Sequence, residues 1–427
     1  MYKAPRGTRD ILPEEQPYWR FVEESIHRIC QLYGYQKIDI PIFEETSLFE
    51  RGVGKATDIV EKEMYSFEDK GGESITLRPE FTAGVVRAYL EHGMHVLPQP
   101  VKLYSIGPAF RYDRPQAGRY RQFYQFNAEA IGVQDPALDV EVMSLARQFY
   151  TELGFKGLSF QINSIGCPKC RPNYLRVLLG YYEQHLDEIC DDCRRRLKRN
   201  PLRVLDCKNE RCQSIIAGAP PILDYLCQEC REHFEALRRY LDLLGWPYTL
   251  NPRLVRGLDY YTKTVFEVWV GGIGAQSALC GGGRYDGLAE ELGGNPTPGV
   301  GFAVGLDRTI LAMKAQGIEV PSLPAPQVSL IYLGQEAKKT AFKLLTSLRE
   351  AGIGVTCAFG DRSLKAQMRE ADRREVVYTL IIGQQELEAG QVVVRDMLRG
   401  EQRPVAMGEV IAWLRERLNL VERGRDW

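Results

Sequence analysis

The chain reads Leu254-Val-Arg-Gly-Leu-Asp-Tyr-Tyr-Thr262, and after Lys263 it continues as Thr264-Val-Phe-Glu-Val268, a segment with the composition of a strand. The first stretch therefore brings one arginine, one aspartate and two adjacent tyrosines to the start of that strand. A guanidinium binds phosphate or carboxylate oxygens through its planar fork, and a tyrosine offers an aromatic face with a hydroxyl at its tip. The plain alternative is a strand edge with ordinary surface aromatics. We expect instead a pocket that holds a phosphate and a flat polar ring together.

Two other arginine clusters lie far from this stretch in the sequence. One is Phe110-Arg-Tyr-Asp-Arg-Pro-Gln-Ala-Gly-Arg-Tyr-Arg-Gln-Phe-Tyr-Gln-Phe126, with four arginines around a turn at Pro115 and Gly118. Strand-like residues at Val101–Ile106 and Gln122–Phe126 flank this turn, so we expect a long hairpin with a basic tip. The other is Gly299-Val-Gly-Phe-Ala-Val-Gly-Leu-Asp-Arg308, a glycine-rich apolar run that ends in one arginine. Any single arginine is most often a solvated surface charge. Three separated arginine sites together predict one polyanionic ligand that is held from several sides.

These clusters carry a family resemblance. The second and third resemble motifs 2 and 3 of the class II aminoacyl-tRNA synthetases. The first stretch, together with Gly282-Gly-Arg-Tyr-Asp-Gly-Leu288, resembles the two signatures peculiar to the histidyl-tRNA synthetase family, and Arg6-Gly-Thr-Arg-Asp-Ile-Leu-Pro13 resembles the start of its chains. The resemblance extends from about residue 5 to about residue 420.

The resemblance implies a fold and an activity. The fold is α+β, with a class II antiparallel-sheet catalytic core, a helical insertion and a C-terminal α/β anticodon-binding domain. The activity is that of a bacterial-type histidine–tRNA ligase. Such an enzyme uses ATP and Mg²⁺ to convert histidine to histidyl-adenylate and pyrophosphate, and then transfers histidine to the 3′ end of tRNA(His). We expect a cytoplasmic homodimer. Its dimerisation element (motif 1) would be an amphipathic helix over residues 15–33, a strand at Tyr35–Ile40 and Pro41.

Adenylate formation concentrates negative charge, because a carboxylate attacks the α-phosphate of ATP while pyrophosphate leaves. Fixed arginines and Mg²⁺ offset that charge. The resemblance implies that Arg111 and Arg256 contact the α-phosphate from two sides and that Arg308 holds the γ-phosphate. Arg119 and Arg121 are further candidates for the triphosphate or for the acceptor end of the tRNA.

A histidine ligand offers an α-ammonium and a ring with one donor and one acceptor nitrogen when neutral. The resemblance implies six pocket residues: Glu80, Thr82 and Gln125 around the ammonium, Glu129 and Tyr261 at the ring, and Tyr260 on the wall. Phe81 stands where glycine is expected, and Asn127 and Ala128 also differ from the usual pattern, so local packing is expected to differ. We expect the glycines at 281–283 to let the backbone approach the bound histidine.

Two other functions remain open from the residues. One is the non-catalytic paralogue that serves as regulatory subunit of ATP phosphoribosyltransferase. That paralogue typically loses signature residues and the C-terminal domain, whereas Arg256, both tyrosines and residues 327–421 are present here. The other is a zinc-dependent RNA-binding protein built around the cysteines, which leaves the three arginine clusters unexplained.

Length and composition agree with a soluble protein of several domains. The chain has 427 residues, 44% of them hydrophobic, and a net charge of −1, values that suit two or three ordinary domains. The charge gives no global sign of nucleic-acid binding, although a local patch such as residues 194–199 can provide it. No apolar run approaches the ~20 residues of a membrane helix, and the N-terminal residues have no apolar segment of a secretory signal.

Changes of pattern along the chain suggest domain boundaries. We expect a catalytic core over residues 1–320, a helical cysteine-rich insertion over 167–240, a proline-rich linker at 321–326 and an anticodon-binding domain over 327–421. The last region alternates strand-like and helix-like segments, which is typical of helices covering a sheet.

Eight of the eleven cysteines fall between positions 167 and 230. They form four close pairs: Cys167/Cys170, Cys190/Cys193, Cys207/Cys212 and Cys227/Cys230. This spacing could supply one or two tetrahedral all-thiolate zinc sites, and the alternative is reduced thiols without metal. Because four thiolates close the coordination shell, we expect any metal to be structural and remote from histidine activation. Cys30, Cys280 and Cys357 are expected to be small buried residues.

Overall fold

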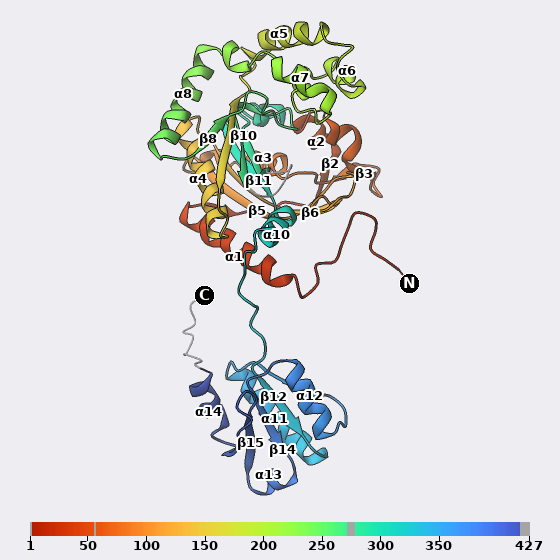
Figure 1. The fold of residues 1–427 in the computed structure, drawn as a ribbon, viewed down its shortest axis with the longest axis vertical. Helices are drawn as coiled ribbons and strands as arrows, with labels where there is room; N and C mark the ends of the chain where they lie inside the picture. The colour runs from red at the N-terminus through yellow and green to blue at the C-terminus, as the bar shows by residue number, and fades with distance from the viewer. Residues whose placement is uncertain (1, 55–56, 271–277, 419–427) are drawn as a thin grey trace. The chain divides into compact units, whose positions relative to one another are not determined.

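The computed structural model describes residues 2–54, 57–270 and 278–418. The chain divides into two compact units, Met1–Pro321 and Ser322–Trp427, each built around its own sheet (Figure 1). Residues 419–421, at the expected end of the C-terminal domain, lie outside the described residues.

An eight-stranded sheet forms the centre of the first unit. In spatial order its strands are β1 (Gln36–Lys37), β5 (Val101–Phe110), β6 (Gln122–Ile131), β11 (Gly299–Gly305), β10 (Ala278–Arg284), β9 (Thr262–Val270), β7 (Leu158–Ser164) and β8 (Tyr248–Leu250). The two edge pairs are parallel and the five inner pairs are antiparallel. The expected antiparallel-sheet core is confirmed.

The basic hairpin is longer than its sequence suggested. We expected strands at Val101–Ile106 and Gln122–Phe126, and the structure pairs β5 and β6 over ten residues each, from Val101 opposite Ile131 to Phe110 opposite Gln122. Burial continues along β6 from Gln125 to Ile131, which favours the longer pairing. The hairpin carries its arginine-rich tip beyond the end of these strands.

Four helices share the main hydrophobic core with one face of this sheet: α1 (Gln16–Leu32), α4 (Pro136–Glu152), α8 (Gln228–Leu243) and α10 (Leu306–Ala315). The amphipathic helix expected at residues 15–33 is confirmed as α1, and Gly34 after it has a φ of +73°, which suits the residue following a helix C-cap. The strand expected at Tyr35–Ile40 is wrong in length. Only Gln36 and Lys37 pair with β5, because the Ser105 hydroxyl donates a hydrogen bond to the carbonyl of Ile38, the next residue.

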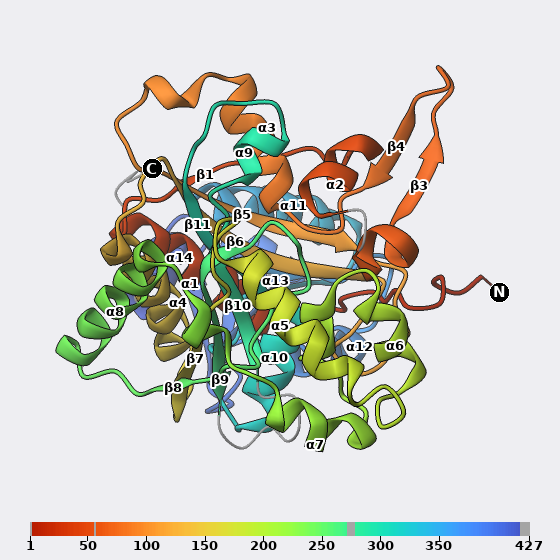
Figure 2. The same cartoon turned by 90° about the horizontal axis from the view of Figure 1, so that it is seen from above.

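Residues between β1 and β5 form a smaller layer. It contains the sheet β2–β4–β3 and short helices: β2 (Phe43–Glu45), α2 (Thr46–Gly52), η1 (Ile59–Glu63), β3 (Tyr65–Glu68), β4 (Ser74–Leu77), α3 (Thr82–Glu91) and η2 (Met94–Val96). The short helix α9 (Leu288–Glu291) packs against α3 and α2. Figure 2 shows the β3–β4 hairpin projecting from the rest of the unit.

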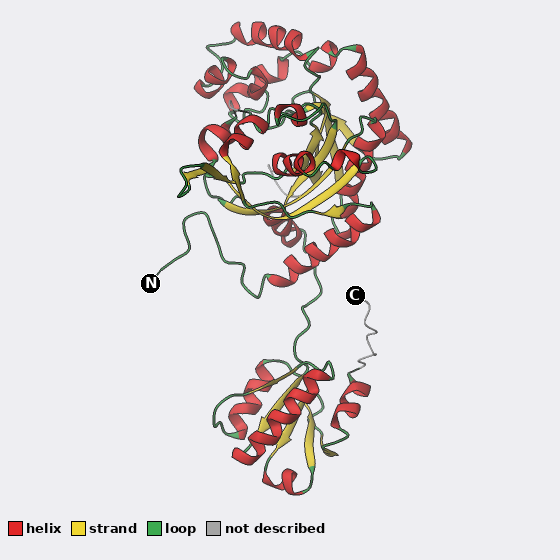
Figure 3. Ribbon diagram, turned by 180° about the vertical axis from the view of Figure 1, so that it is seen from behind, coloured by secondary structure: helices red, strands yellow, loops and turns green. Residues whose placement is uncertain are grey.

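The chain between β7 and β8 is an insertion of helices and loops (Figure 3). Before α8 it contains α5 (Arg171–Glu183), α6 (Asp191–Leu197), η3 (Pro201–Val204), α7 (Glu210–Gly218) and η4 (Ile222–Tyr225). Helix α8 then returns to the core, where it packs against α4.

The second unit is an α/β domain. Its five-stranded sheet has the order β13–β12–β14–β15–β16, with parallel pairs on both sides of β12 and antiparallel pairs beyond β14. The elements are β12 (Val328–Tyr332), α11 (Gln335–Glu350), β13 (Val355–Cys357), α12 (Leu364–Arg373), β14 (Tyr378–Ile382), α13 (Gln384–Glu388), β15 (Gln391–Asp396), β16 (Gln402–Ala406) and α14 (Val410–Arg417).

Within the described ranges, no helix combines the length and the apolar composition that crossing a membrane requires.

Candidate functional site

A cavity of about 530 Å³ opens in the first unit, where all three arginine clusters meet. The expected site residues that line it are Glu80, Thr82, Arg111, Arg119, Gln125, Arg256, Tyr260, Tyr261 and Arg308. Segments far apart in the sequence thus line the same cavity. The stretch that opened the sequence lies at this cavity and its two tyrosines are buried, so the surface-aromatic alternative is wrong.

Arg111 follows β5 at the base of the basic loop. Its Nε donates to the Pro79 carbonyl at 2.8 Å, and its guanidinium carbon lies 5.4 Å from the centre of the Phe123 ring. Burial lowers the pKa of Arg111, because a desolvated guanidinium lacks the stabilisation that water gives its charge. An anion in the cavity would supply that stabilisation.

Arg256 lies in the cavity against strand β10. Its Nη1 donates to Glu267 Oε1 at 2.8 Å, while its Nε is buried without a hydrogen-bond partner among the described residues. A Cβ on Gly281 would lie 2.1 Å from the Arg256 Nη2. Gly281 therefore makes room for this arginine, a role beyond the expected approach of the backbone to histidine. Gly282 has another role, since a Cβ there would meet the Gly301 carbonyl at 2.4 Å.

Arg308 and Arg119 also face the cavity. Arg308 lies in the first turn of α10 and donates to the Ala278 carbonyl at 3.4 Å, and burial with the nearby positive charge of Arg119 lowers its pKa. Arg119 is paired with Asp113 at 3.0 Å. Gly118 has a φ of +71°, and a Cβ there would meet Leu311 at 3.0 Å. Arg121 stacks on Tyr112 at 3.7 Å and does not line the cavity.

Glu80 joins the cavity wall to the start of α3. Its carboxylate accepts from the backbone amides of Thr82 and Ala83, at 2.7 and 2.9 Å, and Tyr260 donates to it at 3.4 Å. An acid in this position stabilises the N-terminus of a helix. A carboxylate has more than two acceptor positions, so Glu80 can still receive an ammonium group.

Phe81, the departure noted in the sequence, packs beneath this wall. Its ring centre lies 4.1 Å from the Arg78 guanidinium carbon, and Arg78 donates to the backbone carbonyls of Pro108, Ile40 and Pro41. The larger residue thus fills a buried space and removes no cavity-facing group.

Two amide oxygens in the cavity wall lack a partner in the described part of the chain. Gln125 Oε1 and Asn127 Oδ1 are both buried and accept no hydrogen bond there. Both residues line the cavity. Burying an amide oxygen without a donor is costly, so the site is prepared for a ligand that carries donors, as an ammonium group does. Asn127 is a site residue that the sequence indicated only as a departure.

Glu129 does not line the cavity but lies directly behind Thr82. Its carboxylate accepts from the Thr82 hydroxyl at 2.7 Å and from the Tyr285 hydroxyl at 2.6 Å. Burial raises the pKa of Glu129 to about 8 despite these two donors. Gly301 stands opposite Glu129 in the β6–β11 register, and a Cβ there would lie 1.8 Å from Glu129 Oε2.

The insertion supplies two cavity arginines that the sequence did not single out for this site. Arg196 and Arg203 both pair with Asp58 Oδ2, at 3.3 and 3.2 Å, and all three line the cavity. The run of basic residues at 194–199 was expected to be a solvated face or a tRNA contact. Its periodicity gave no means of predicting that Arg196 turns toward Asp58.

The eight insertion cysteines gather into two sets of four. Set I is Cys167, Cys170, Cys227 and Cys230, and set II is Cys190, Cys193, Cys207 and Cys212; within each set the sulfurs lie within 4.8 Å of one another. The spacing in sequence left this pairing open. The other three cysteines, Cys30, Cys280 and Cys357, are buried as expected.

Comparisons with known proteins agree across the chain. A profile of the histidyl-tRNA synthetase family matches residues 7–169 and 210–309, and one of the anticodon-binding domain matches 327–417. The histidine–tRNA ligase of Pelotomaculum thermopropionicum is 56% identical over 97% of both chains, and that of Desulforamulus reducens 52% identical over 97% of this chain and 99% of its own. The apo histidyl-tRNA synthetase of S. aureus superposes with a TM-score of 0.81 at 41% identity, covering 97% of this chain and 99% of its own.

Proposed function

We propose a function from one premise: the chain belongs to the histidyl-tRNA synthetase family. Its activity is that of a histidine–tRNA ligase, the name that its full-length relatives carry. It activates histidine with ATP and transfers it to tRNA. The regulatory-subunit alternative is not favoured, because relatives above 50% identity over nearly the whole chain are named as ligases.

The observation that carries the activation step is the convergence of four arginines in one cavity, three of which are partly buried. Arg111 and Arg256 would contact the α-phosphate, while Arg308 and Arg119 would hold the phosphates that leave as pyrophosphate. Fixed guanidiniums stabilise charge that develops at the reacting phosphorus. Mg²⁺ would arrive with ATP and neutralise phosphate charge, and Glu267 is a cavity carboxylate that could contact it.

Histidine would lie between Glu80 and Glu129. The unpaired Gln125 oxygen and the Glu80 carboxylate suit its ammonium group. Thr82 stands between that end of the pocket and Glu129, and the Tyr260 and Tyr261 rings, with centres 4.7 Å apart, form the wall. Glu129 would reach the imidazole ring after a small movement of Thr82. A carboxyl with a pKa of about 8 can share one proton with a ring nitrogen of histidine.

The second unit would bind the anticodon arm of the tRNA. Support comes from the anticodon-binding profile, which matches residues 327–417, and from the compact separation of this unit at Pro321. The core over residues 1–320 would carry both chemical steps, with 321–326 as the linker and the 167–240 insertion beside the cavity.

A homodimer is the proposed assembly, formed through the α1–β1 region, and cytoplasm is the proposed location. The apolar side chains of Leu32, Ile42 and Phe43 are exposed in the single chain. A second copy of the same surface would bury them, as in an isologous dimer.

Structural zinc is proposed for both cysteine sets. Four thiolates about 2.3 Å from a tetrahedral Zn²⁺ lie about 3.8 Å apart. The measured Sγ–Sγ distances are 3.8 Å for Cys167–Cys170, Cys167–Cys227 and Cys190–Cys207, and 3.9 Å for Cys170–Cys230 and Cys193–Cys212. The donor sets therefore fit one zinc ion each.

Charging of tRNA(His) with labelled histidine tests the whole proposal. The purified chain should esterify histidine to this tRNA in an ATP-dependent reaction and should leave a tRNA of another identity uncharged. Absence of histidine esterification by a folded, zinc-replete preparation would refute the ligase function.

A further inference from the structure

We propose that set I is a zinc site that positions the histidine pocket. The inference rests on the proposed ligase function, and it deepens that function by giving the metal a specific task. Set I fixes the starts of helices α5 and α8, because Cys170 and Cys227 directly precede them. Each helix start then holds one residue of the segment Tyr261–Lys263, which leads from the pocket wall into β9.

The first contact is made by Arg171, the first residue of α5. Its Nη2 donates to the Tyr261 carbonyl at 2.6 Å and to the Gly166 carbonyl at 3.3 Å, and its Nε donates to the Ile165 carbonyl at 3.2 Å. Arg171 therefore binds the backbone of a pocket tyrosine and the backbone that leads into Cys167. Movement of the α5 start would move the Tyr261 backbone with it.

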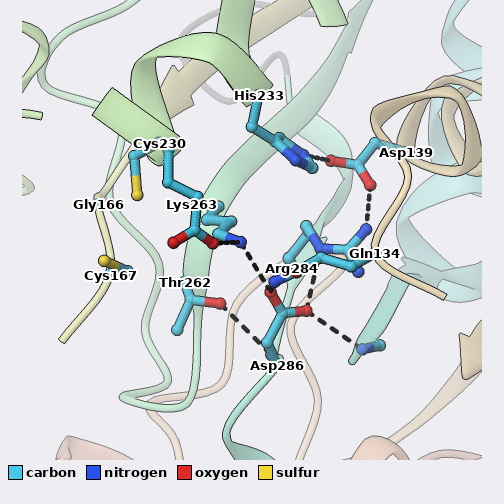
Figure 4. A network of polar contacts seen from close by, with 12 residues as sticks. Gln134, Asp139, Gly166, Cys167, Cys230, His233, Thr262, Lys263, Arg284 and Asp286 are labelled. Atoms are coloured by element: carbon cyan, nitrogen blue, oxygen red, sulfur yellow. Dashed lines mark hydrogen bonds and ion pairs between the residues drawn. The ribbon is translucent and has the colours of Figure 1, made fainter. Parts of the chain in front are cut away.

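The second contact is made by Glu229, in the first turn of α8. It accepts from Lys263 Nζ at 2.7 Å, and Lys263 is 4% exposed and has a left-handed φ of +50°. The Lys263 amide donates to the Gly166 carbonyl at 2.8 Å, and the Lys263 carbonyl accepts from the Ile165 amide at 2.8 Å. Figure 4 shows Cys230, Cys167 and Gly166 around Lys263. An unusual backbone conformation persists only where its surroundings hold it.

A third connection runs along α8 to Glu129. His233, three residues after Cys230, has Nε2 2.8 Å from Asp139, and Asp139 also pairs with the fully buried Arg284 (Figure 4). Arg284 directly precedes Tyr285, whose hydroxyl donates to Glu129. Helix α8 carries the set I ligand Cys230 and directly follows the ligand Cys227. It is thus connected both to Tyr261 and to Glu129 of the proposed histidine pocket.

The cysteines themselves are placed for this task by the backbone. Gly166 has a φ of +66°, and a Cβ there would lie 2.8 Å from the Cys170 sulfur. With zinc, the four thiolates join the 166–171 loop to the 226–230 loop through one closed shell. Without zinc, the four sulfurs keep only weak thiol contacts to one another. For set I this proposal differs from the expectation that metal in the insertion is remote from activation.

Set II makes different contacts and offers a matched control. Its ligands flank Asn200 and Arg203, which donate to Asp259 at 2.9 Å and to the Arg256 carbonyl at 3.4 Å. These contacts lie at the Arg256 side of the cavity. Loss of set II should affect ATP more than histidine.

The test compares C167S/C230S with C190S/C212S in the full chain. Zinc is measured by mass spectrometry of anaerobically purified protein, and histidine affinity by calorimetry without ATP. Wild type should hold about two zinc ions, one for each set, and each variant about one. Histidine Kd should rise about tenfold, equivalent to ~1.4 kcal/mol, in C167S/C230S, and should stay within about twofold in C190S/C212S.

Arg171 provides a variant that keeps the metal ligands. R171A should retain about two zinc ions yet weaken histidine binding severalfold, whereas R176A, on the exposed side of the same helix, should change neither. This pair remains informative if the cysteine variants do not fold. Unchanged histidine affinity in both R171A and a folded C167S/C230S would overturn the inference, and so would wild-type protein without zinc at set I. Failure of wild type to bind histidine at all would instead refute the proposed function.

Discussion

The proposed histidine pocket and the insertion beside it hold their side chains by different means. In the pocket, the sheet positions them: Glu129 faces Gly301 across β6 and β11, and Arg256, in the loop before β9, lies over Gly281 of β10. In the insertion, Arg196 and Arg203 pair with a partly exposed Asp58, and the proposed zinc ions would hold the helices at the two cysteine sets. Register permits almost no adjustment, whereas partly exposed ion pairs exchange readily with water. Substitutions in the pocket should therefore cost more than loss of the Asp58 ion pairs.

The largest effect is expected for Arg256→Ala. Removing one preorganised donor from a developing charge costs about 10²–10³ in rate, and Arg256 is the guanidinium that β10 makes room for. Adenylate formation should fall by that factor while histidine affinity changes little. The neighbouring Arg253→Ala is the control, since Arg253 is exposed. Retention of activity within a few-fold in Arg256→Ala would show that the arginine does not act on the α-phosphate.

The next effect is expected for Gly301→Ala. Its methyl group would lie 1.8 Å from Glu129 Oε2 and 2.6 Å from the Ala128 carbonyl, so Glu129 or the strand pairing must shift. Overpacking of this kind costs ~1–3 kcal/mol of folding stability, and displacement of Glu129 should in addition weaken histidine binding. Gly287→Ala is matched, because a Cβ there meets nothing within 4 Å. Equal histidine binding by both variants would mean that the register does not fix Glu129.

Glu129→Gln should have a smaller effect with a distinct pH signature. Wild type should bind histidine best between the ring pKa of ~6.5 and the Glu129 pKa of about 8. We expect the bound ring to be doubly protonated beside ionised Glu129. Within that window, the neutral ring of free histidine takes its second proton from Glu129, so binding needs no proton from water. Above it Glu129 is already ionised and the ring must take this proton from water, so affinity falls.

The glutamine variant cannot lose that proton. Its affinity at pH 7 should be lower by ~1.5 kcal/mol, the loss of one charge-assisted hydrogen bond, but it should not decline further as the pH rises above about 8. Calorimetric titrations across this range measure both properties. A wild-type affinity that rises through pH 8 would contradict the proton-sharing arrangement.

The smallest effect is expected for Asp58→Asn in the insertion contact. Burial raises the Asp58 pKa, but Arg196 and Arg203 lower it more, and the net direction is down. An acid with a depressed folded-state pKa stabilises the fold above its ordinary pKa and loses that contribution as pH falls through the folded value. At neutral pH the pairs are fully present, and partly exposed pairs are worth ~1 kcal/mol or less. Thermal unfolding and adenylate formation should both change only slightly.

Most of the site residues expected from the sequence line one cavity, because each motif combines its polar side chains with a neighbouring strand. Arg111, Arg256 and Arg308 line one cavity, as the polyanion expectation required. Long-range register could not be read from periodicity. The distances that leave no room for a side chain at Gly301, and the position of Glu129 behind Thr82, appear only when β6 and β11 are paired.

The insertion was less predictable for a physical reason. Cysteine spacing identifies pairs, but their combination into sets depends on how α5, α6, α7 and α8 pack, and residues 170–209 also lie outside the matched family profile. Similarly, the basic residues at 194–199 have no periodicity from which the ion pair between Arg196 and Asp58 could be predicted. The expected length of strand β1 was too great. The alternation of apolar and polar residues does not show that the Ser105 hydroxyl, and not a backbone amide, donates to the Ile38 carbonyl.

Histidine-dependent exchange of pyrophosphate into ATP measures the central claim most directly, because it needs only the strand-built cavity and neither tRNA nor the second unit. The purified wild-type chain should catalyse exchange with histidine and should give only background with the other amino acids. Exchange that is absent with histidine, or equally fast with another amino acid, would contradict the assignment of this cavity to histidine activation.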